Sequence, residues 1–235
     1  TYTDNQMSYA YYQLPNGRVA CIDDDCDFPP LNHALKEPNG LIAIGGDLSL
    51  PRLLNAYQHG IFPWFSEGEP ILWWSPNPRM VLFPDELKIS NSLKKTLKNK
   101  PFEVRFNTAF RQVISACSHT PRADQPGTWI TQGIIDAYCA LHDAGYAISA
   151  ECWQNNVLVG GCYGVKIGKM FYGESMFHHV TDASKVAFVH LVQQLKSQGV
   201  GLIDCQMKTA HLARFGAKEI PRDAFFEHLT VLTKS

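Results

Sequence analysis

The amino-acid sequence predicts an α+β protein in two parts: a small, loop-rich N-terminal domain over residues 1–78 and a larger domain over residues 79–235 with a mainly antiparallel sheet. Prolines and glycines punctuate the first part, which favours turns over regular elements. In the second part, strand-like runs joined by short polar turns predict antiparallel hairpins, followed by a helix and a further strand. The expected strands are 146–153, 157–165, 169–177 and 201–206.

Helices are expected where apolar residues recur three and four apart behind a residue that can cap a helix N-terminus. The expected N-caps are Ser49, Asn107, Thr131 and Asp182. Glycines are expected to end three of these helices, because glycine readily adopts the left-handed conformation that commonly follows a helix. These glycines are Gly60, Gly145 and Gly199.

Composition places the chain among folded proteins, since 45% of its 235 residues are apolar and 18% are charged. No apolar run approaches the roughly eighteen residues of a membrane span, and no secretory signal pattern is present, so we expect a cytoplasmic protein with no membrane partner. The seven cysteines are scattered and odd in number, which favours reduced thiols over disulfides or a zinc site. We also expect residues 1–6 to be a foreign extension ahead of a native start at Met7.

The net charge of −1 argues by itself against a nucleic-acid-binding protein. The distribution of charge argues for one, because the stretch from Lys88 to Arg111 holds seven basic residues and a single acidic residue. Within it, Lys94, Lys95 and Lys98 are candidates to contact phosphate groups. The charge pattern alone fits equally well a helix whose lysines simply face solvent.

Three polar residues lie in otherwise apolar strands, where a carboxylate or amide must find a partner. Asp204 and Gln206 lie two apart in the run 202–206, so strand alternation puts both on one face. Glu174 lies in the apolar run 171–177. Each residue alone is more simply explained as satisfying a neighbouring backbone group or lysine, but the three together on adjacent strands indicate a catalytic site.

Such a site suits the attack of a free amine on an activated acyl ester. The amine loses a proton as it attacks, and an ionised Asp204 that polarises the Gln206 amide lets the amide oxygen accept that proton or orient the amine. Because the ester is already activated, positioning and charge stabilisation suffice without a metal or a covalent intermediate. The pair His178-His179 lacks metal-ligand spacing, Cys205 is expected to face away from the catalytic pair, and no nucleotide-binding glycine loop occurs.

Tryptophans form a second group of interest. Trp64, Trp73 and Trp74 lie in the loop-rich part, and Trp129 precedes the helix expected at Thr131. Such residues are more often core anchors than stacking platforms. Beside a basic segment and an acyl-transfer centre, they become candidates to stack on a terminal base.

From about Phe28 to Phe226 the sequence resembles the bacterial leucyl/phenylalanyl-tRNA–protein transferases, through a series of motifs in the same order and spacing. These motifs are Glu37-Pro38-Asn39-Gly40-Leu41, Gly45-Gly46-Asp47-Leu48, Gly60-Ile61-Phe62-Pro63-Trp64-Phe65, Trp73-Trp74-Ser75-Pro76, Gly127-Thr128-Trp129-Ile130-Thr131, Gly173-Glu174-Ser175-Met176-Phe177 and Leu202-Ile203-Asp204-Cys205-Gln206. The resemblance implies a C-terminal domain with the GCN5-related N-acyltransferase fold. It implies transfer of Leu, Phe and, less readily, Met from aminoacyl-tRNA to proteins with N-terminal Arg or Lys, in the N-degron degradation pathway, with no cofactor.

The resemblance also implies roles for individual residues. Asp204 and Gln206 would be the catalytic pair and Glu174 an acidic group near the acceptor, while Trp64 and Trp129 would contact the aminoacyl-adenosine end. Lys94, Lys95 and Lys98 would bind the tRNA. The pocket for the transferred side chain would be lined by Cys162, Phe171, Phe188, Leu191, Leu195 and Ile203. We expect the protein to act as a monomer.

Two alternatives stay open. An acetyl-CoA-dependent N-acetyltransferase of the same fold needs a glycine-containing loop that cradles pyrophosphate at a helix start, and the approach to the helix at Asp182 has no glycine. A non-catalytic module that binds tRNA or N-degrons needs the basic face and an acidic pocket, but not the pair Asp204 and Gln206.

Overall fold

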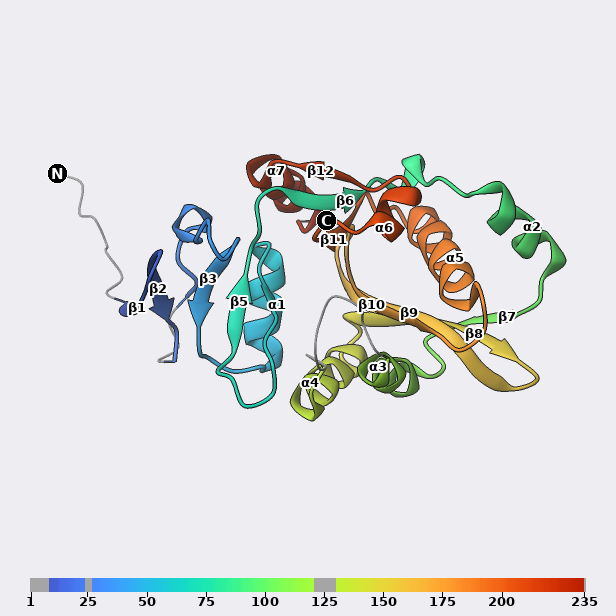
Figure 1. The fold of residues 1–235 in the computed structure, drawn as a ribbon, viewed down its shortest axis with the longest axis horizontal. Helices are drawn as coiled ribbons and strands as arrows, with labels where there is room; N and C mark the ends of the chain where they lie inside the picture. Colours follow the sequence, from blue (N-terminus) through green and yellow to red (C-terminus); the bar gives the residue numbers. More distant parts are fainter. Residues whose placement is uncertain (1–8, 24–26, 121–129, 235) are drawn as a thin grey trace.

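The computed structural model describes residues 9–23, 27–120 and 130–234, and its strands form two sheets (Figure 1). The first sheet has five strands in the order β1-β2-β3-β5-β4. Its strands are β1 (Ala10–Leu14), β2 (Gly17–Cys21), β3 (Leu41–Ile44), β4 (Phe62–Pro63) and β5 (Leu72–Trp74). The first sheet thus lies wholly within the loop-rich part of the sequence.

The second sheet has seven strands in the order β12-β6-β11-β10-β9-β8-β7. Its strands are β6 (Arg79–Leu82), β7 (Glu103–Phe106), β8 (Ala147–Gln154), β9 (Val157–Ile167), β10 (Met170–His178), β11 (Leu202–Gln206) and β12 (Lys218–Ile220). Neighbouring strands are antiparallel except β10 and β11, which run parallel. The predicted α+β class with a mainly antiparallel sheet is confirmed.

Helices cover both faces of the second sheet (Figure 1). The helices are α1 (Leu50–Gln58), α2 (Asn91–Asn99), α3 (Phe110–His119), α4 (Gln132–Asp143), α5 (Ala183–Ser197), α6 (Ala210–Arg214) and α7 (Arg222–Leu232), with 3-10 turns η1 (Leu31–His33) and η2 (Pro84–Glu86). Helices α3 and α4 pack on one face of β8–β10 and α5 packs on the other, while α1 stands between the first sheet and α4. None of the helices in the described part of the chain is long and apolar enough to cross a membrane.

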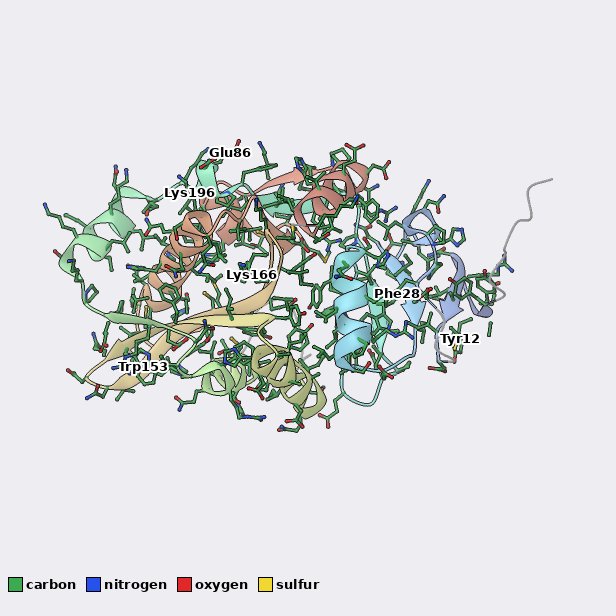
Figure 2. The ribbon with its side chains drawn as sticks, turned by 180° about the vertical axis from the view of Figure 1, so that it is seen from behind. Tyr12, Phe28, Glu86, Trp153, Lys166 and Lys196 are labelled. Atoms are coloured by element: carbon green, nitrogen blue, oxygen red, sulfur yellow. The ribbon has the colours of Figure 1, made fainter. Side chains whose placement is uncertain are left out.

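A single hydrophobic cluster joins the two sheets. It includes Tyr57 and Trp73 from the first part of the chain together with Tyr138, Tyr163 and Tyr172 from the second. Phe28, in the connection between β2 and β3, packs edge-to-face on Trp73 with ring centres 5.1 Å apart, and Figure 2 labels it beside the first sheet. A second cluster fills the space between α5 and the opposite face of β8–β11. The boundary at residue 78 therefore separates two sheets but does not separate two cores.

Two of the predicted helix caps are confirmed and two need correction. The side chains of Ser49 and Thr131 accept hydrogen bonds from Arg52 N and Ile134 N, as expected of N-caps. The prediction that Asn107 caps a helix is wrong, because α3 begins behind Ala109. Asn107 has φ 59°, and its Oδ1 instead accepts a 3.0 Å hydrogen bond from Ser149 N on β8.

Asp182 stands at the predicted N-cap position of α5, but its carboxylate makes no hydrogen bond to its own helix. Its backbone is left-handed, with φ 68°, whereas a capping side chain normally needs extended backbone. The carboxylate instead accepts a 3.0 Å hydrogen bond from Thr96 Oγ1, and Lys185 Nζ lies 3.8 Å away. Asp182 therefore attaches α2 to the start of α5.

Candidate active site

Strands β10 and β11 bring the candidate catalytic residues together at the point where both strands become irregular. The two strands pair in parallel only as far as Tyr172 and Asp204. Beyond that point the register of β10 shifts around Glu174, and the register of β11 shifts just ahead of Gln206. Such bulges redirect side chains. Here they place Gln206 Nε2 within hydrogen-bond distance of Glu174 Oε2, at 3.4 Å.

The prediction that Asp204 and Gln206 lie on one face rested on regular strand alternation, and this premise is wrong because the register of β11 shifts between the two residues. Gln206 has φ 66°, in the left-handed backbone region that residues other than glycine and asparagine seldom adopt. Its backbone N–H donates a 2.8 Å hydrogen bond to Asp204 Oδ1, which stabilises this conformation. Asp204 thus reaches Gln206 through the backbone, while the Gln206 side chain bonds Glu174.

Asp204 is 1% exposed, and its charge is matched by Arg79, which is equally buried. Arg79 Nε donates to Oδ1 at 2.9 Å and Nη2 donates to Oδ2 at 2.7 Å. Two parallel bonds between a guanidinium and a carboxylate form a strong and directional pair. The sequence reasoning missed Arg79, although an arginine at the start of the otherwise apolar strand Arg79–Leu82 is a signal of the same kind as Asp204.

The remaining donors of Arg79 bond groups from the first part of the chain. Its Nη1 donates to the Gly60 carbonyl at 2.9 Å and lies 3.3 Å from Ser75 Oγ. The guanidinium also lies over two aromatic rings, 5.1 Å from the centre of Phe62 and 4.4 Å from that of Phe225. Arg79 therefore contacts α7, the end of the first part of the chain and the candidate catalytic strand at once.

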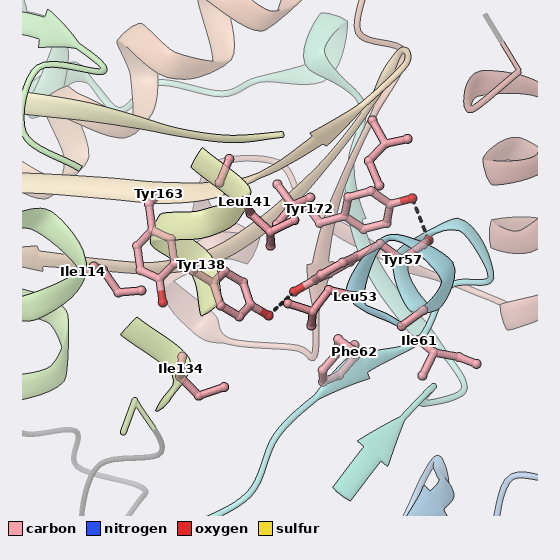
Figure 3. Packing of buried hydrophobic residues seen from close by; sticks show 14 of the residues in the cluster. Leu53, Tyr57, Ile61, Phe62, Ile114, Ile134, Tyr138, Leu141, Tyr163 and Tyr172 are labelled. Atoms are coloured by element: carbon pink, nitrogen blue, oxygen red, sulfur yellow. Dashed lines mark hydrogen bonds between the residues drawn. The ribbon is translucent and has the colours of Figure 1, made fainter. Parts of the chain in front are cut away.

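Glu174 is partly buried and is held by a chain of tyrosine hydroxyls. Tyr57 on α1 donates a hydrogen bond to Glu174 Oε1, and its hydroxyl also bonds that of Tyr138 on α4. The Tyr172 hydroxyl donates to the Tyr57 carbonyl oxygen at 2.7 Å, and Figure 3 shows how these rings converge. Sequence reasoning missed this role of Tyr57 and Tyr138, because both fit the apolar stripes of their helices and gave no separate signal.

Burial and neighbouring charge set the protonation of these groups. Burial raises the pKa of Glu174 to about 8, the negative charge of Asp204 acts in the same direction, and hydrogen bonds from Tyr57 and Gln206 and the charge of Arg79 oppose it. Burial and the nearby Glu174 charge also raise the pKa values of Tyr57 and Tyr138 well above the usual value, so both stay hydrogen-bond donors. A cation arriving at Glu174 favours its ionised form.

The structure brings the six predicted pocket residues together in the cluster beneath α5. Phe171 on β10 and Ile203 on β11 are register partners, and Cys162 lies on the neighbouring strand β9. The other three residues project from α5; they are Phe188, Leu191 and Leu195. All six are at most 5% exposed, so they form a closely packed apolar layer. Burial raises the pKa of the Cys162 thiol, which keeps it an uncharged part of this layer.

The tryptophans divide between core and surface. Trp73 is fully buried and donates from Nε1 to the Gly45 carbonyl at 2.7 Å, which is the behaviour of a core anchor. Trp64 is 36% exposed and meets Trp74 edge-to-face at 5.7 Å between ring centres. Trp129 lies outside the described residues. Of the two tryptophans predicted to contact the aminoacyl-adenosine end, the structure therefore describes only Trp64. It follows Phe62, whose ring Arg79 contacts, by two residues.

The remaining sequence-predicted residues lie at the periphery. Lys94, Lys95 and Lys98 are exposed on α2, which is anchored by the buried Leu93. Cys205 is partly buried against the cluster beneath α5, on the side of Ile203, as predicted. No group of three or more His, Cys, Asp or Glu in the described part of the chain is arranged to hold a metal ion.

Comparisons with known proteins give a consistent result. A family model described as leucyl/phenylalanyl-tRNA protein transferase matches residues 81–230, and one described as the N-terminal domain of the same family matches residues 46–77. Curated relatives carry the name leucyl/phenylalanyl-tRNA–protein transferase. The relative from Nitrosomonas eutropha is 62% identical over 215 residues, which is 92% of each chain, and the one from Chromobacterium violaceum is 61% identical over 202 residues, which is 86% of each.

Among solved structures, similarity extends to a GCN5-related N-acetyltransferase from Kribbella flavida. The TM-score is 0.38 and the identity 9%, over 71% of this chain and 59% of the other.

Proposed function

The chain belongs to the leucyl/phenylalanyl-tRNA–protein transferase family and is therefore an aminoacyltransferase, and on this premise we propose its substrates and the roles of its residues. It transfers Leu, Phe and, less readily, Met from aminoacyl-tRNA to the α-amino group of proteins that begin with Arg or Lys. It does so as a cytoplasmic monomer without ATP or metal, and the product enters the N-degron degradation pathway.

The different environments of the two candidate carboxylates support this acceptor class. Asp204 is already paired with Arg79. Glu174 is bonded by Tyr57 and Gln206, and none of the ion pairs between described residues includes it. A carboxyl group that is oriented but has no ion-pair partner suits a guanidinium or ammonium group from a substrate, which would also favour its ionised form. We therefore assign the cationic side chain of the acceptor to Glu174.

Gln206 is the group proposed to meet the attacking amine. Because its Nε2 is directed to Glu174, the amide plane is fixed and its carbonyl oxygen is available to accept a hydrogen bond from the amine. The amine nitrogen attacks the ester carbonyl carbon, the new C–N bond forms, and the bond to the ribose oxygen breaks. The proton lost by the amine ends on the ribose hydroxyl that leaves with the tRNA. Asp204 holds the Gln206 backbone in this arrangement.

The donor is proposed to occupy the other face of the same strands. Its Leu or Phe side chain enters the apolar layer of Cys162, Phe171 and Ile203 beneath α5, so these closely packed residues must separate to admit it. The terminal adenosine stacks on Trp64, with Trp129 as the second proposed contact. Lys94, Lys95 and Lys98 on α2 bind phosphates of the tRNA.

The test is to incubate the protein with radiolabelled Phe-tRNA and a peptide that begins with Arg, without ATP or CoA. Label in the peptide is the expected result, and a matched peptide that begins with Glu is expected to stay unlabelled because it offers no cation to pair with Glu174. Transfer only from labelled acetyl-CoA would support the N-acetyltransferase alternative. Binding of Phe-tRNA without any transfer would support the binding-module alternative.

A further inference from the structure

We propose that Arg79 is a positioning residue for acyl transfer: its bidentate bond to Asp204 fixes the backbone of Gln206, and through it the amide that faces the attacking amine. The inference rests on the proposed function, since it gives Arg79 a part in that same reaction. Arg79 on β6 thereby controls the orientation of the Gln206 amide on β11.

The contacts form an unbroken chain from Arg79 to the reacting groups. Asp204 Oδ1 accepts from Arg79 Nε at 2.9 Å and from Gln206 N at 2.8 Å, so the same oxygen atom serves both. The left-handed backbone of Gln206 depends on that oxygen staying in place. The Gln206 amide then meets Glu174 at 3.4 Å. Without Arg79 the carboxylate is free to rotate, and the amide loses its fixed direction.

A role in stability alone does not explain this arrangement. Replacing a buried ion pair by two apolar side chains of similar size is often neutral or stabilising. Two apolar side chains cannot accept the Gln206 N–H, whereas the Asp204 carboxylate, oriented by its two bonds to Arg79, does so. Positioning Gln206 is therefore the one function of the Arg79–Asp204 pair that apolar residues cannot take over.

Arg79 also relates the acceptor side of the site to the segment that carries Trp64. Its Nη1 donates to the Gly60 carbonyl, and its guanidinium lies over Phe62, two residues ahead of Trp64. One rigid side chain thereby sets the spacing between the proposed adenosine contact and the Gln206 amide. A lysine at this position keeps the charge but cannot make these planar, forked contacts.

The first experiment compares Arg79→Lys with the wild-type protein in the Phe-tRNA transfer assay. We expect kcat to fall about 100-fold, the effect of misplacing a reacting group by about 1 Å. The KM values for Phe-tRNA and the Arg peptide should change little, because Arg79 touches neither substrate. The matched control is Arg222→Gln. Arg222 is half-buried and donates to the Ser75 carbonyl, but it forms no hydrogen bond or ion pair with Asp204 among the described residues, so kcat should stay within about twofold of the wild-type value.

The second experiment separates positioning from folding. The double variant Arg79→Met with Asp204→Leu removes both charges and leaves no unpaired buried charge. We therefore expect its melting temperature to lie close to that of the wild type, while its kcat is as low as that of Arg79→Lys. A double variant with wild-type kcat would overturn the proposal. If wild-type protein itself fails to label the peptide, the proposed function fails instead, so the two failures are distinguishable.

A pH profile distinguishes position from charge. Glu174 is faced by Tyr57, Tyr138, Asp204, Gln206 and Arg79. Because Arg79→Lys keeps the positive charge, we expect its kcat to stay low across the range from pH 6 to about pH 9 that brackets the pKa of Glu174, near 8. Full recovery of kcat at high pH would show that Arg79 acts through the ionisation of Glu174 and would contradict the positioning role.

Discussion

The two faces of the β10–β11 pair have opposite characters. On the face toward α1 and α4, Tyr172, Asp204 and Glu174 take part in directed hydrogen bonds, with partners on α1, on β6 and on β11 itself. On the face toward α5, Phe171 and Ile203 pack against apolar side chains. A directed bond fixes one geometry, whereas an apolar layer tolerates neighbours of different size. The contrast predicts that changes on the first face alter the reaction and changes on the second alter the choice of donor.

The largest effect is expected on the polar face, from Gln206→Ala. Loss of the amide that accepts from the attacking amine should lower kcat by about 100-fold or more, within the range for a group that assists proton transfer. Affinity for Phe-tRNA, measured by filter binding, should be unchanged. The control is Met207→Ala, the next residue, which is 56% exposed and should leave kcat unaltered. Equal activity of the two variants would remove Gln206 from the reaction.

An intermediate effect is expected on the apolar face, from Leu191→Ala. The variant should lose about 2–5 kcal/mol of unfolding free energy in urea denaturation, because the residue is buried. Its enlarged pocket should raise kcat/KM for Phe-tRNA relative to Leu-tRNA by about tenfold. Val189→Ala is the matched control: it also empties space beneath α5 but is not a predicted pocket residue, so stability should fall while the donor ratio stays constant. If the ratio of kcat/KM for Phe-tRNA to that for Leu-tRNA is unchanged in both variants, the donor pocket does not lie beneath α5.

The last effect, which leaves the fold and the donor choice unchanged, is expected in the pH dependence of stability. Folding raises the pKa of Glu174 from its ordinary 4.5 to about 8, so the folded state holds a proton that the unfolded state releases. The stabilisation from this proton is complete below pH 4.5 and is lost as the pH rises to about 8, by at most about 1.4 kcal/mol per pH unit. Glu174→Gln should flatten this slope in urea titrations, whereas Glu86→Gln, a change at an exposed residue bonded to Lys218, should not. Identical slopes in all three proteins would contradict the raised pKa.

The sequence predicts the site only where polarity conflicts with its surroundings. Asp204, Gln206 and Glu174 stand out because carboxylates and amides do not belong in apolar strands. Tyr57 and Tyr138 do not stand out, because a tyrosine satisfies an apolar helix stripe while its hydroxyl does something else. The pairing of Arg79 with Asp204 spans 125 residues of sequence, and no local pattern reveals such a partner.

The fold shows the same division. Long strands such as β9 and helices with confirmed caps at Ser49 and Thr131 follow from local pattern. The strands β6, β7 and β12 have only three or four residues, too few for alternation to be recognised. Asn107 fails as a predicted cap because a distant strand, through Ser149, competes for its side chain.

The span of the Arg79 contacts also bears on the order of events during protein synthesis. Arg79 meets Gly60, Asp204 and Phe225, and the last of these reaches the folding chain long after the first. Contacts of such long sequence separation form late, since loop closure must precede them. Until residue 225 has left the ribosome, the guanidinium lacks part of its final surroundings. Competence for catalysis is therefore acquired at the end of folding, and a nascent chain that has completed only its first sheet has no active centre.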